Sequence, residues 1–348
     1  MGARHGATPA VITRGSYANK RRKSSGVVRV WYDSIVELPI APGRLVPGGF
    51  DVVGFGLNTI DLIAVVERYP EPDSKRQMTD FVEHPGGQAA TAMTACARLG
   101  WRARYVGRFG DDARGRLARV SLEEEGVDLS ACEAVGAPQP VSLILVDGAG
   151  RRTVLWSRAP LLNMEAGDVD PGVVSSGRVL LVDCHQTAAA TQAAECARRS
   201  GVPTMIDVEK VRPGMEELLA HIDLIITAQT FPEAFTGVSG VGTALAALAR
   251  RFQPALVCAT LGEEGSLALV GGTEIHTPGF RVPVVDTTGA GDVFRGGFIA
   301  GWLTAGARTQ AEDVLTYANA VAALQCRALG ARTAIPRRAE VEHLLASA

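Results

Sequence analysis

The chain has 348 residues, of which 47% are hydrophobic and 21% charged, with a formal net charge of −2 at pH 7. This length can bury a large core, in one large domain or in two smaller ones. The balanced charge gives no indication of a nucleic-acid partner. No apolar run is long enough to cross a membrane, so no membrane partner is expected. The six cysteines include no Cys-x-x-Cys pair, which argues against zinc or a disulfide framework and favours the cytoplasm.

Residues 1–48 are expected to precede the folded domain, which would occupy residues 49–348. Residues 1–30 carry seven basic side chains and no acidic one, with a cluster from Lys20 to Lys23. This composition predicts a disordered basic leader, or a start codon set too far upstream. A transit peptide and a polyanion-binding arm are the alternatives. The segment has no apolar core, so it is not a secretory signal.

The first half of the domain mixes strand and helix patterns. A helix is predicted from Gln88 to Leu99, where Gly100 is a natural cap, and a second helix covers about 113–125. The turn Asp147-Gly148-Ala149-Gly150 lies between two β-rich runs and predicts a hairpin. Strands are expected at 51–58, 62–66, 76–83, 104–106, 141–146 and 153–157.

The second half alternates apolar strands with amphipathic helices. Such continuous apolar strands are typical of a parallel, doubly wound sheet, so the fold class is α/β. Strands are expected at 179–182, 204–207, 224–226, 256–258, 266–270 and 273–276. Helices are expected at about 187–200, 213–220, 231–236, 241–252, 290–305, 311–327 and 337–346.

The most informative stretch runs from Val284 to Phe298. Val284 and Val285 are expected to end a strand, and the small residues of Gly289-Ala290-Gly291 then open a helix. The free N–H groups and the dipole of a helix start favour an anion such as phosphate. Asp292 follows at once. It is either a capping residue or a base, kept ionised by the same dipole, that takes the proton of an attacking hydroxyl.

The run Asp286-Thr-Thr-Gly-Ala-Gly-Asp292 resembles the C-terminal signature of the ribokinase-like (PfkB) carbohydrate kinases. A second run, from Gly86-Gly87-Gln88 to Gly107–Asp112, resembles the N-terminal signature of that family. The resemblance covers about 52–336. It implies a ribokinase-like, mainly parallel sheet with helices on both faces, and a small β-sheet lid. The lid strands would lie near 62–66, 76–83, 141–146 and 153–157.

The resemblance also implies roles for particular residues. Asp292 would be the base, and Gly289, Ala290 and Gly291 the anion hole. The substrate would lie against Asn58, Gly86, Gly87, Gln88 (where Asn is usual) and Asp61, which ends the pattern Gly56-Leu-Asn-Thr-Ile-Asp61. The nucleotide would lie against Thr260, Gly262, Gly265 and Asn319. Glu233 would organise Mg²⁺ through water, with Thr230 in place of the usual Asn, while Asp286, Thr288 and the loop 327–333 would hold a monovalent cation such as K⁺.

These features predict an enzyme that uses Mg²⁺ and ATP to phosphorylate a hydroxyl of a small sugar. The sulfofructose and ketohexose kinase branches are the most similar in pattern. A nucleoside kinase of the same fold and a non-catalytic sugar- or nucleotide-binding regulator are the alternatives. Lys75 is expected where the lid meets the cleft, and would bind an anionic group on the sugar. His185, at a strand end, is read as a substrate-side contact or as packing, and a homodimer through the lid is expected.

Overall fold

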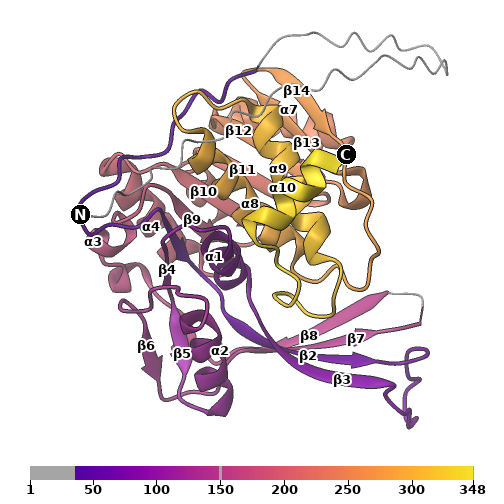
Figure 1. Ribbon diagram of the computed structural model, residues 1–348. Coiled ribbons are helices and arrows are strands. Elements are labelled where there is room, and N and C mark those ends of the chain that lie inside the picture. Colours follow the sequence, from indigo (N-terminus) through magenta and orange to yellow (C-terminus); the bar gives the residue numbers. More distant parts are fainter. Residues whose placement is uncertain (1–35, 149–150, 348) are drawn as a thin grey trace, which may run out of the picture. The chain divides into compact units, whose positions relative to one another are not determined.

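The computed structural model describes residues 36–148 and 151–347, and its centre is one eight-stranded sheet (Figure 1). The strand order is β14-β13-β12-β11-β10-β9-β1-β4. All neighbouring pairs are parallel except those of the two strands at one edge, β13 (Ser266–Val270) and β14 (Thr273–Thr277). The parallel strands are β1 (Val52–Phe55), β4 (Ala103–Val106), β9 (Leu180–Asp183), β10 (Thr204–Val208), β11 (Leu224–Ala228) and β12 (Leu256–Thr260).

Helices cover both faces of this sheet, which explains why its strands are apolar throughout. Successive side chains alternate between two cores: Leu181 packs with one set of helices, and Leu180 and Val182 pack with the other. The first face carries α1 (Gln88–Arg98), α8 (Ala290–Ala305) and α9 (Ala311–Gln325). The second face carries α4 (Thr187–Arg199), α5 (Met215–Leu219), α6 (Phe231–Thr236) and α7 (Val241–Phe252).

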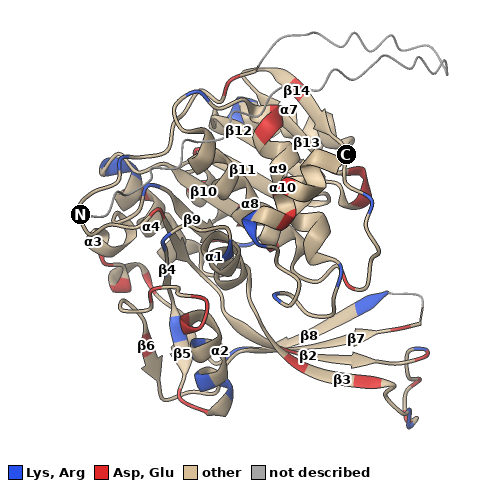
Figure 2. Ribbon diagram, viewed as in Figure 1, with Lys and Arg blue, Asp and Glu red and all other residues tan. Residues whose placement is uncertain are grey.

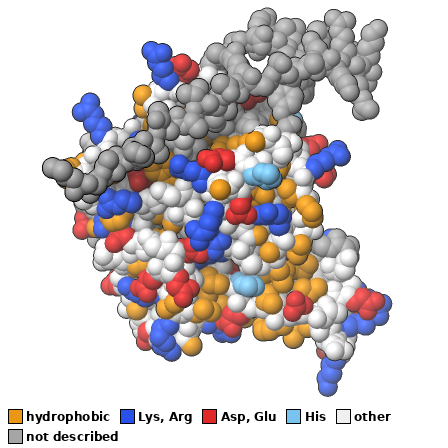
Figure 3. All heavy atoms as spheres, viewed as in Figure 1, with side chains coloured by type: hydrophobic (Ala, Val, Ile, Leu, Met, Phe, Trp, Pro, Cys, Tyr) orange, Lys and Arg blue, Asp and Glu red, His pale blue; other side chains and the backbone are white. Residues whose placement is uncertain are grey.

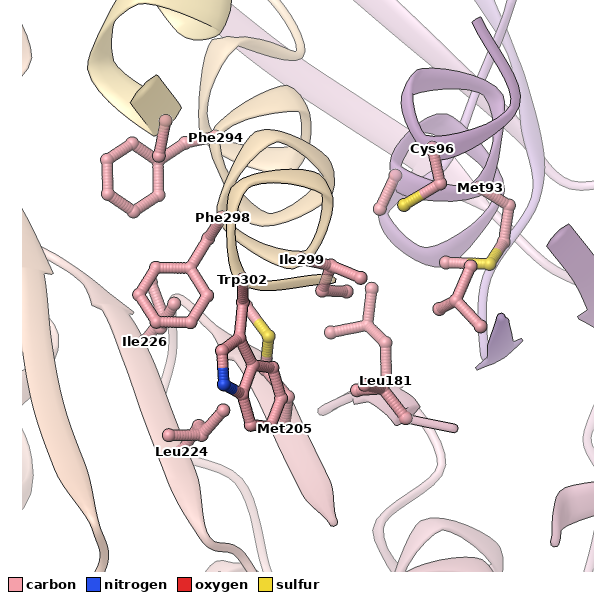
Figure 4. Close-up of a cluster of buried hydrophobic side chains, with 14 of the residues drawn as sticks. Met93, Cys96, Leu181, Met205, Leu224, Ile226, Phe294, Phe298, Ile299 and Trp302 are labelled. Atoms are coloured by element: carbon pink, nitrogen blue, oxygen red, sulfur yellow. The ribbon is translucent and has the colours of Figure 1, made fainter. Parts of the chain in front are cut away.

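The core under α8 holds that helix on the sheet. Phe294, Phe298 and Trp302 lie one turn apart on α8 and belong to the core between this helix and the sheet, where Trp302 lies beside Met205 and Leu224 (Figure 4). Each of these side chains is almost completely buried. Burial of a large apolar side chain stabilises a fold by about 1.5–3 kcal/mol. The start of α8 is therefore placed by a rigid, well-packed element.

A second, four-stranded sheet projects from the large one as the lid, in the order β3-β2-β7-β8 (Figure 1). Its central strands are parallel, and both outer pairs are antiparallel. The side chains of Val154 and Trp156 on one face of β8 line the cavity described below. The lid strands are β2 (Thr59–Val65), β3 (Asp80–Gly86), β7 (Val141–Val146) and β8 (Arg152–Ser157).

Smaller elements complete the described chain. Helix α2 (Ala113–Glu123) contacts the lid strands β2 and β3, and α10 (Arg338–Ser347) contacts α9. The others are β5 (Arg108–Gly110), β6 (Glu133–Val135), α3 (Pro171–Val174), η1 (Pro160–Leu162), η2 (Ala166–Asp168) and η3 (Gly262–Glu264). Within the described residues, no helix combines the length and apolar character that a bilayer crossing requires.

Three expected strand positions need correction. Strand β2 begins at Thr59 instead of residue 62, so Asp61 lies inside a lid strand and not in a turn. Strand β3 covers Asp80–Gly86 instead of 76–83, because its pairing with β2 begins only at Asp80. Val284 and Val285 belong to no strand, and both are 62% exposed.

The expected domain boundary at residue 49 also needs correction. The compact unit begins at Val36, while the basic leader of residues 1–35 lies outside the described residues. The Leu38 side chain is buried in the core, and its N–H donates to Thr309 O at 2.8 Å. Gly43 N–H donates to Arg178 O at 2.8 Å. Residues 36–48 are therefore part of the folded domain.

Candidate active site

One cavity of about 730 Å³ lies between the lid and the carboxyl ends of the parallel strands. Ligands of doubly wound sheets bind outside this edge. Leu57, His185 and Thr260 mark the ends of β1, β9 and β12 along the cavity. The start of α8 and the lid strands β2, β7 and β8 form the remaining walls.

The start of α8 faces this cavity. Gly289 has a φ of 75°, which favours glycine, and α8 begins at the next residue. A Cβ on Gly289 would also lie 2.6 Å from Ala331 O. Thr288, Gly289 and Gly291 line the cavity, so the backbone at the start of α8 lies beside it. The turn expected to form an anion hole therefore lies at the cavity, although the N–H of Ala290 donates to Thr287 O at 3.2 Å.

Asp292 lines the same cavity from the first turn of α8. Burial raises the pKa of its carboxyl well above the ordinary value, and the nearby Asp207 carboxylate raises it further. Arg295 opposes the rise in pKa, since its positive charge favours the ionised form. The expectation that the helix dipole keeps Asp292 ionised is therefore incomplete, because desolvation acts in the opposite direction.

Two further charged residues, Arg295 and Asp207, lie close to Asp292. Arg295 forms an ion pair with Asp207 and donates to Ile226 O at 3.2 Å. Burial raises the pKa of Asp207 to about 6, although Arg295 acts to lower it. Neither Arg295 nor Asp207 was identified from the sequence. Asp207 ends an apolar strand, and that position was an available signal.

Asp286 holds the turn that precedes α8. Its Oδ1 accepts from Thr288 N and Thr288 Oγ1 at 2.9 and 2.8 Å, and its Oδ2 accepts from Gly330 N at 2.8 Å. The turn is thereby tied to the loop 327–333, which was expected to hold a monovalent cation together with Asp286 and Thr288. Among the described residues, no group of three or more His, Cys, Asp or Glu side chains is arranged to hold a metal ion.

The opposite end of the cavity carries the residues expected at the acceptor. Asp61 and Gln88 line it, and Thr59 Oγ1 donates to Asp61 at 3.0 Å. Burial raises the pKa of Asp61, while hydrogen bonds from Thr59 and Ser142 act to lower it. Oε1 of Gln88 is buried with no hydrogen-bond partner. A carboxylate and an unpaired amide oxygen together suit the hydroxyls of a sugar.

The two glycines before Gln88 are required by close backbone contacts. A Cβ on Gly86 would lie 2.1 Å from the carboxylate of Asp61, and a Cβ on Gly87 would lie 2.5 Å from Asn58 Cα. Behind them lies Arg332, a buried residue that the sequence analysis missed. Its guanidinium donates to Gly86 O, and to Thr91 Oγ1 at 3.2 Å. Only the fold brings this arginine to the Gly-Gly turn.

Asn58 and Lys75 do not line the cavity. The Asn58 amide donates to Tyr105 Oη and Arg108 O and accepts from Gln139, so protein groups use both of its ends. Lys75 lies in the connection between β2 and β3, beyond the Val65–Asp80 pair and at the opposite end from the Thr59–Gly86 pair at the cavity. Figure 2 shows basic residues at this far tip of the lid. The lid thus carries Lys75 away from the acceptor.

Of the residues expected at the nucleotide and at the metal, some line the cavity and others do not. Thr260 lines the cavity, whereas Gly262, Gly265 and Asn319 do not. Asn319 instead donates to Ser266 Oγ and Thr277 O, both at 3.1 Å, and so joins β13 to β14. Glu233 is exposed on α6 and accepts from Gly240 N at 2.9 Å. The carboxylate that faces the cavity after β10 is Glu209, which the sequence analysis missed.

Fold and site together define a ribokinase-like kinase. The family model for pfkB family carbohydrate kinases matches residues 50–338, and the chain belongs to this family. It is an ATP-dependent sugar kinase. The chain is 32% identical to an ATP-dependent ribose-1-phosphate kinase of Halopiger xanaduensis, over 79% of this chain and 91% of that protein. It is 29% identical to a fructokinase of Klebsiella pneumoniae, over 81% and 97%.

Solved structures agree with this assignment. The ribokinase of Thermotoga maritima superposes with a TM-score of 0.73 at 26% identity, over 85% of this chain and 99% of that one. The Arabidopsis thaliana ribokinase complexed with ribose and ATP also gives a TM-score of 0.73, at 25% identity, over 88% and 99%. The expectation of a ribokinase-like fold with a small second sheet is confirmed.

Proposed function

We propose that this cavity is where the γ-phosphoryl group of ATP is transferred to a sugar hydroxyl, and that Asp292 is the general base of this reaction. The observation that carries the proposal is that one cavity joins Asp292 and the start of α8 to Asp61 and Gln88. Asp292 takes the proton of the attacking hydroxyl. The new O–P bond forms as the bond between the β-oxygen and the γ-phosphorus breaks, and ADP leaves.

Each end of the cavity has its own task in this proposal. The N–H groups of Gly289 and Gly291 stabilise the charge on the transferred group, as preorganised donors do, and Ala290 holds the turn by donating to Thr287 O. Asp61 and Gln88 orient the sugar by accepting hydrogen bonds from its hydroxyls. The adenine end lies along Thr260, where the chain after β12 turns. Gly262, Gly265 and Asn319 support that end through their backbone and amide contacts.

ATP is used with Mg²⁺, which neutralises charge that develops on the phosphates. Glu209 is our candidate for holding the water shell of this ion, because it lines the cavity and its side chain has no hydrogen-bond or ion-pair partner among the described residues. K⁺ at Asp286 and Thr288 would order the turn before the anion hole. Because protein hydrogen bonds already hold that turn, exchanging K⁺ for Na⁺ should lower turnover far less than removing Mg²⁺ does.

The proposal is tested by ADP release with Mg·ATP across a panel of pentoses, ketohexoses, their phosphates and nucleosides. Turnover with sugars and none with nucleosides is expected. Preference for a nucleoside would identify the nucleoside-kinase alternative instead. No turnover with any acceptor, together with measurable sugar or nucleotide binding, would favour a regulator.

We further propose a homodimer through the lid, in a chain that works in the cytoplasm. Phe81 and Leu155 are 49% and 56% exposed on the face of the lid opposite Trp156. Hydrophobic side chains gather over the lid at the lower right of Figure 3. Leu155→Asp should convert a dimer to a monomer in sedimentation. All six cysteines are free thiols, as a reducing compartment favours. Cell fractionation tests whether the protein is in the cytoplasm.

A further inference from the structure

A cluster of cations lines the cavity, distinct from Lys75, which lies at the far end of the lid. Arg158 follows β8, His185 follows β9, and Arg212 follows β10. The Nε atoms of both arginines are buried and have no hydrogen-bond partner. Buried guanidinium donors are rarely left unpaired, because losing hydration without a replacement acceptor costs free energy.

The hydrogen bonds of the two arginines go to uncharged groups. Arg158 Nη2 donates to Leu162 O at 3.0 Å, and Arg212 Nη2 lies 3.3 Å from His185 Nδ1. Among the described residues, neither guanidinium has an ion pair, in contrast to Arg295. Asp183 acts on Arg158 electrostatically, but its two oxygens accept from Leu57 N and His185 N.

The other charged groups around the cluster form no ion pair with Arg158 or Arg212 in the described part of the chain. Burial and the charge of Arg212 both lower the pKa of Arg158, so the two arginines repel one another. Burial also lowers the pKa of His185. A neutral His185 accepts from Arg212 at Nδ1 and presents Nε2–H as a donor. Lys210 adds a further cation to the cavity wall, and Glu209 a carboxylate.

The position of the cluster assigns it to the acceptor. In the sheet, β9 lies between β1 and β10. The strands β11 and β12 lie on the other side of β10. Thr260, at the end of β12, is the residue proposed to contact the nucleotide. Asp207, which acts on Asp292, is the last-but-one residue of β10. His185 and Arg158 therefore lie on the acceptor side of the base.

We propose that Arg158, Arg212 and His185 form a subsite for a second anionic group, a phosphate ester or a sulfonate, carried by the acceptor sugar. Forked guanidinium donors match such tetrahedral oxyanions, and an anion here would supply the charge partner that both arginines lack within the described residues. The subsite rests on the proposed function, because it assumes that the sugar lies beside Asp61 and Gln88. The acceptor is then an already charged sugar, and the product carries two anionic groups.

The test compares neutral sugars with their monophosphate and sulfonate derivatives in wild type, Arg158→Met and Arg212→Met. We expect the wild type to prefer a charged acceptor. Each variant should lower kcat/KM for that acceptor by about 10- to 100-fold, as expected for loss of a charge-assisted contact. The KM for ATP and kcat/KM for neutral sugars should stay near wild type. Comparing kcat/KM for the sugar phosphates with kcat/KM for the sulfonates shows which of the two anionic groups the subsite binds.

Lys75→Met is the matched control, since it removes a lid cation outside the cavity and should leave every acceptor unchanged. Wild-type preference for a neutral sugar would overturn the subsite while leaving the kinase assignment intact. A raised KM for ATP in the arginine variants would also overturn it, because the cluster would then serve the nucleotide.

A binding measurement tests the proposed anion subsite even if no sugar is turned over. Titration calorimetry with sugar monophosphates and sulfonates, without ATP, should show binding to wild type and about 10- to 100-fold weaker binding to Arg158→Met. Arg158→Lys, which keeps the charge but not the fork, should be intermediate, and serves if the methionine variant fails to fold. Equal binding to wild type and variant would overturn the subsite.

Discussion

A guanidinium nitrogen of Arg295 lies 3.1 Å from a carboxylate oxygen of Asp207, and each side chain is only 3% exposed. The pair lies beneath Asp292, whose pKa both residues change in opposite directions. Arg295 also approaches the anion hole, because a Cβ on Gly291 would lie 2.9 Å from its Nη1. A buried pair of this kind contributes little net stability but sets the local charge.

Asp207→Asn should move the acid limb of the kcat/KM profile to lower pH. Asp292 accepts a proton only when ionised, so activity is lost as pH falls through its pKa. Asp207 raises that pKa, and Arg295 remains in the variant to lower it. Measuring kcat/KM against pH checks this. A limb that stays in place or moves upward would show that Asp207 does not act on the base.

Asp292→Asn should lower turnover by about 10²–10⁴-fold, the usual value of general base catalysis. Sugar and ATP binding should change little, because Asn keeps the size of the side chain. Asp313→Asn is the control, since Asp313 also lies in the first turn of a helix, α9, and is exposed. Wild-type turnover in the purified Asp292 variant would contradict the assignment of the base.

Gly289→Ala should abolish most turnover, whereas Gly237→Ala should not. Both glycines have the left-handed backbone conformation, with φ of 75° and 71°, so a Cβ costs each variant about 1–2 kcal/mol. Only at Gly289 would the new Cβ also strike a backbone oxygen, that of Ala331, and distort the anion hole. Turnover and melting temperature measured together separate the two effects. Equal losses of turnover would contradict a special role for this turn.

Glu209→Gln should raise the Mg²⁺ concentration needed for half-maximal turnover, while Glu233→Gln should not. Glu209 lines the cavity, whereas Glu233 is exposed on α6 and held by Gly240 N. The measurement is turnover against free Mg²⁺ at fixed ATP. The reverse result would restore the metal role that the sequence suggested for Glu233.

Leu38→Ala should lower the free energy of unfolding by about 2–5 kcal/mol, as removal of a buried leucine side chain does. Leu45→Ala in the same segment should change it by less than about 0.5 kcal/mol, because Leu45 is 52% exposed. Denaturant unfolding compares the two. Similar small losses in both would indicate that residues 36–48 contribute no core.

The sequence alone predicted most of the helices and strands and the glycine turn before α8. The alternating apolar runs predicted the parallel strands, and Gly289-Ala290-Gly291-Asp292 predicted a helix start beside a carboxylate. These features depend on neighbours within a few residues, so a local pattern is enough to specify them. The two glycine motifs gave the family for the same reason.

Only the tertiary structure decided which charged side chains share the cavity. Asn58 resembled a ligand but is used by Tyr105 and Gln139, while the register of β2 and β3 carries Lys75 to the far end of the lid. Arg212 gave no local signal, yet β10 brings it into one cavity with Arg158, which follows β8. Burial and pairing depend on elements far apart in the chain, which no local pattern records.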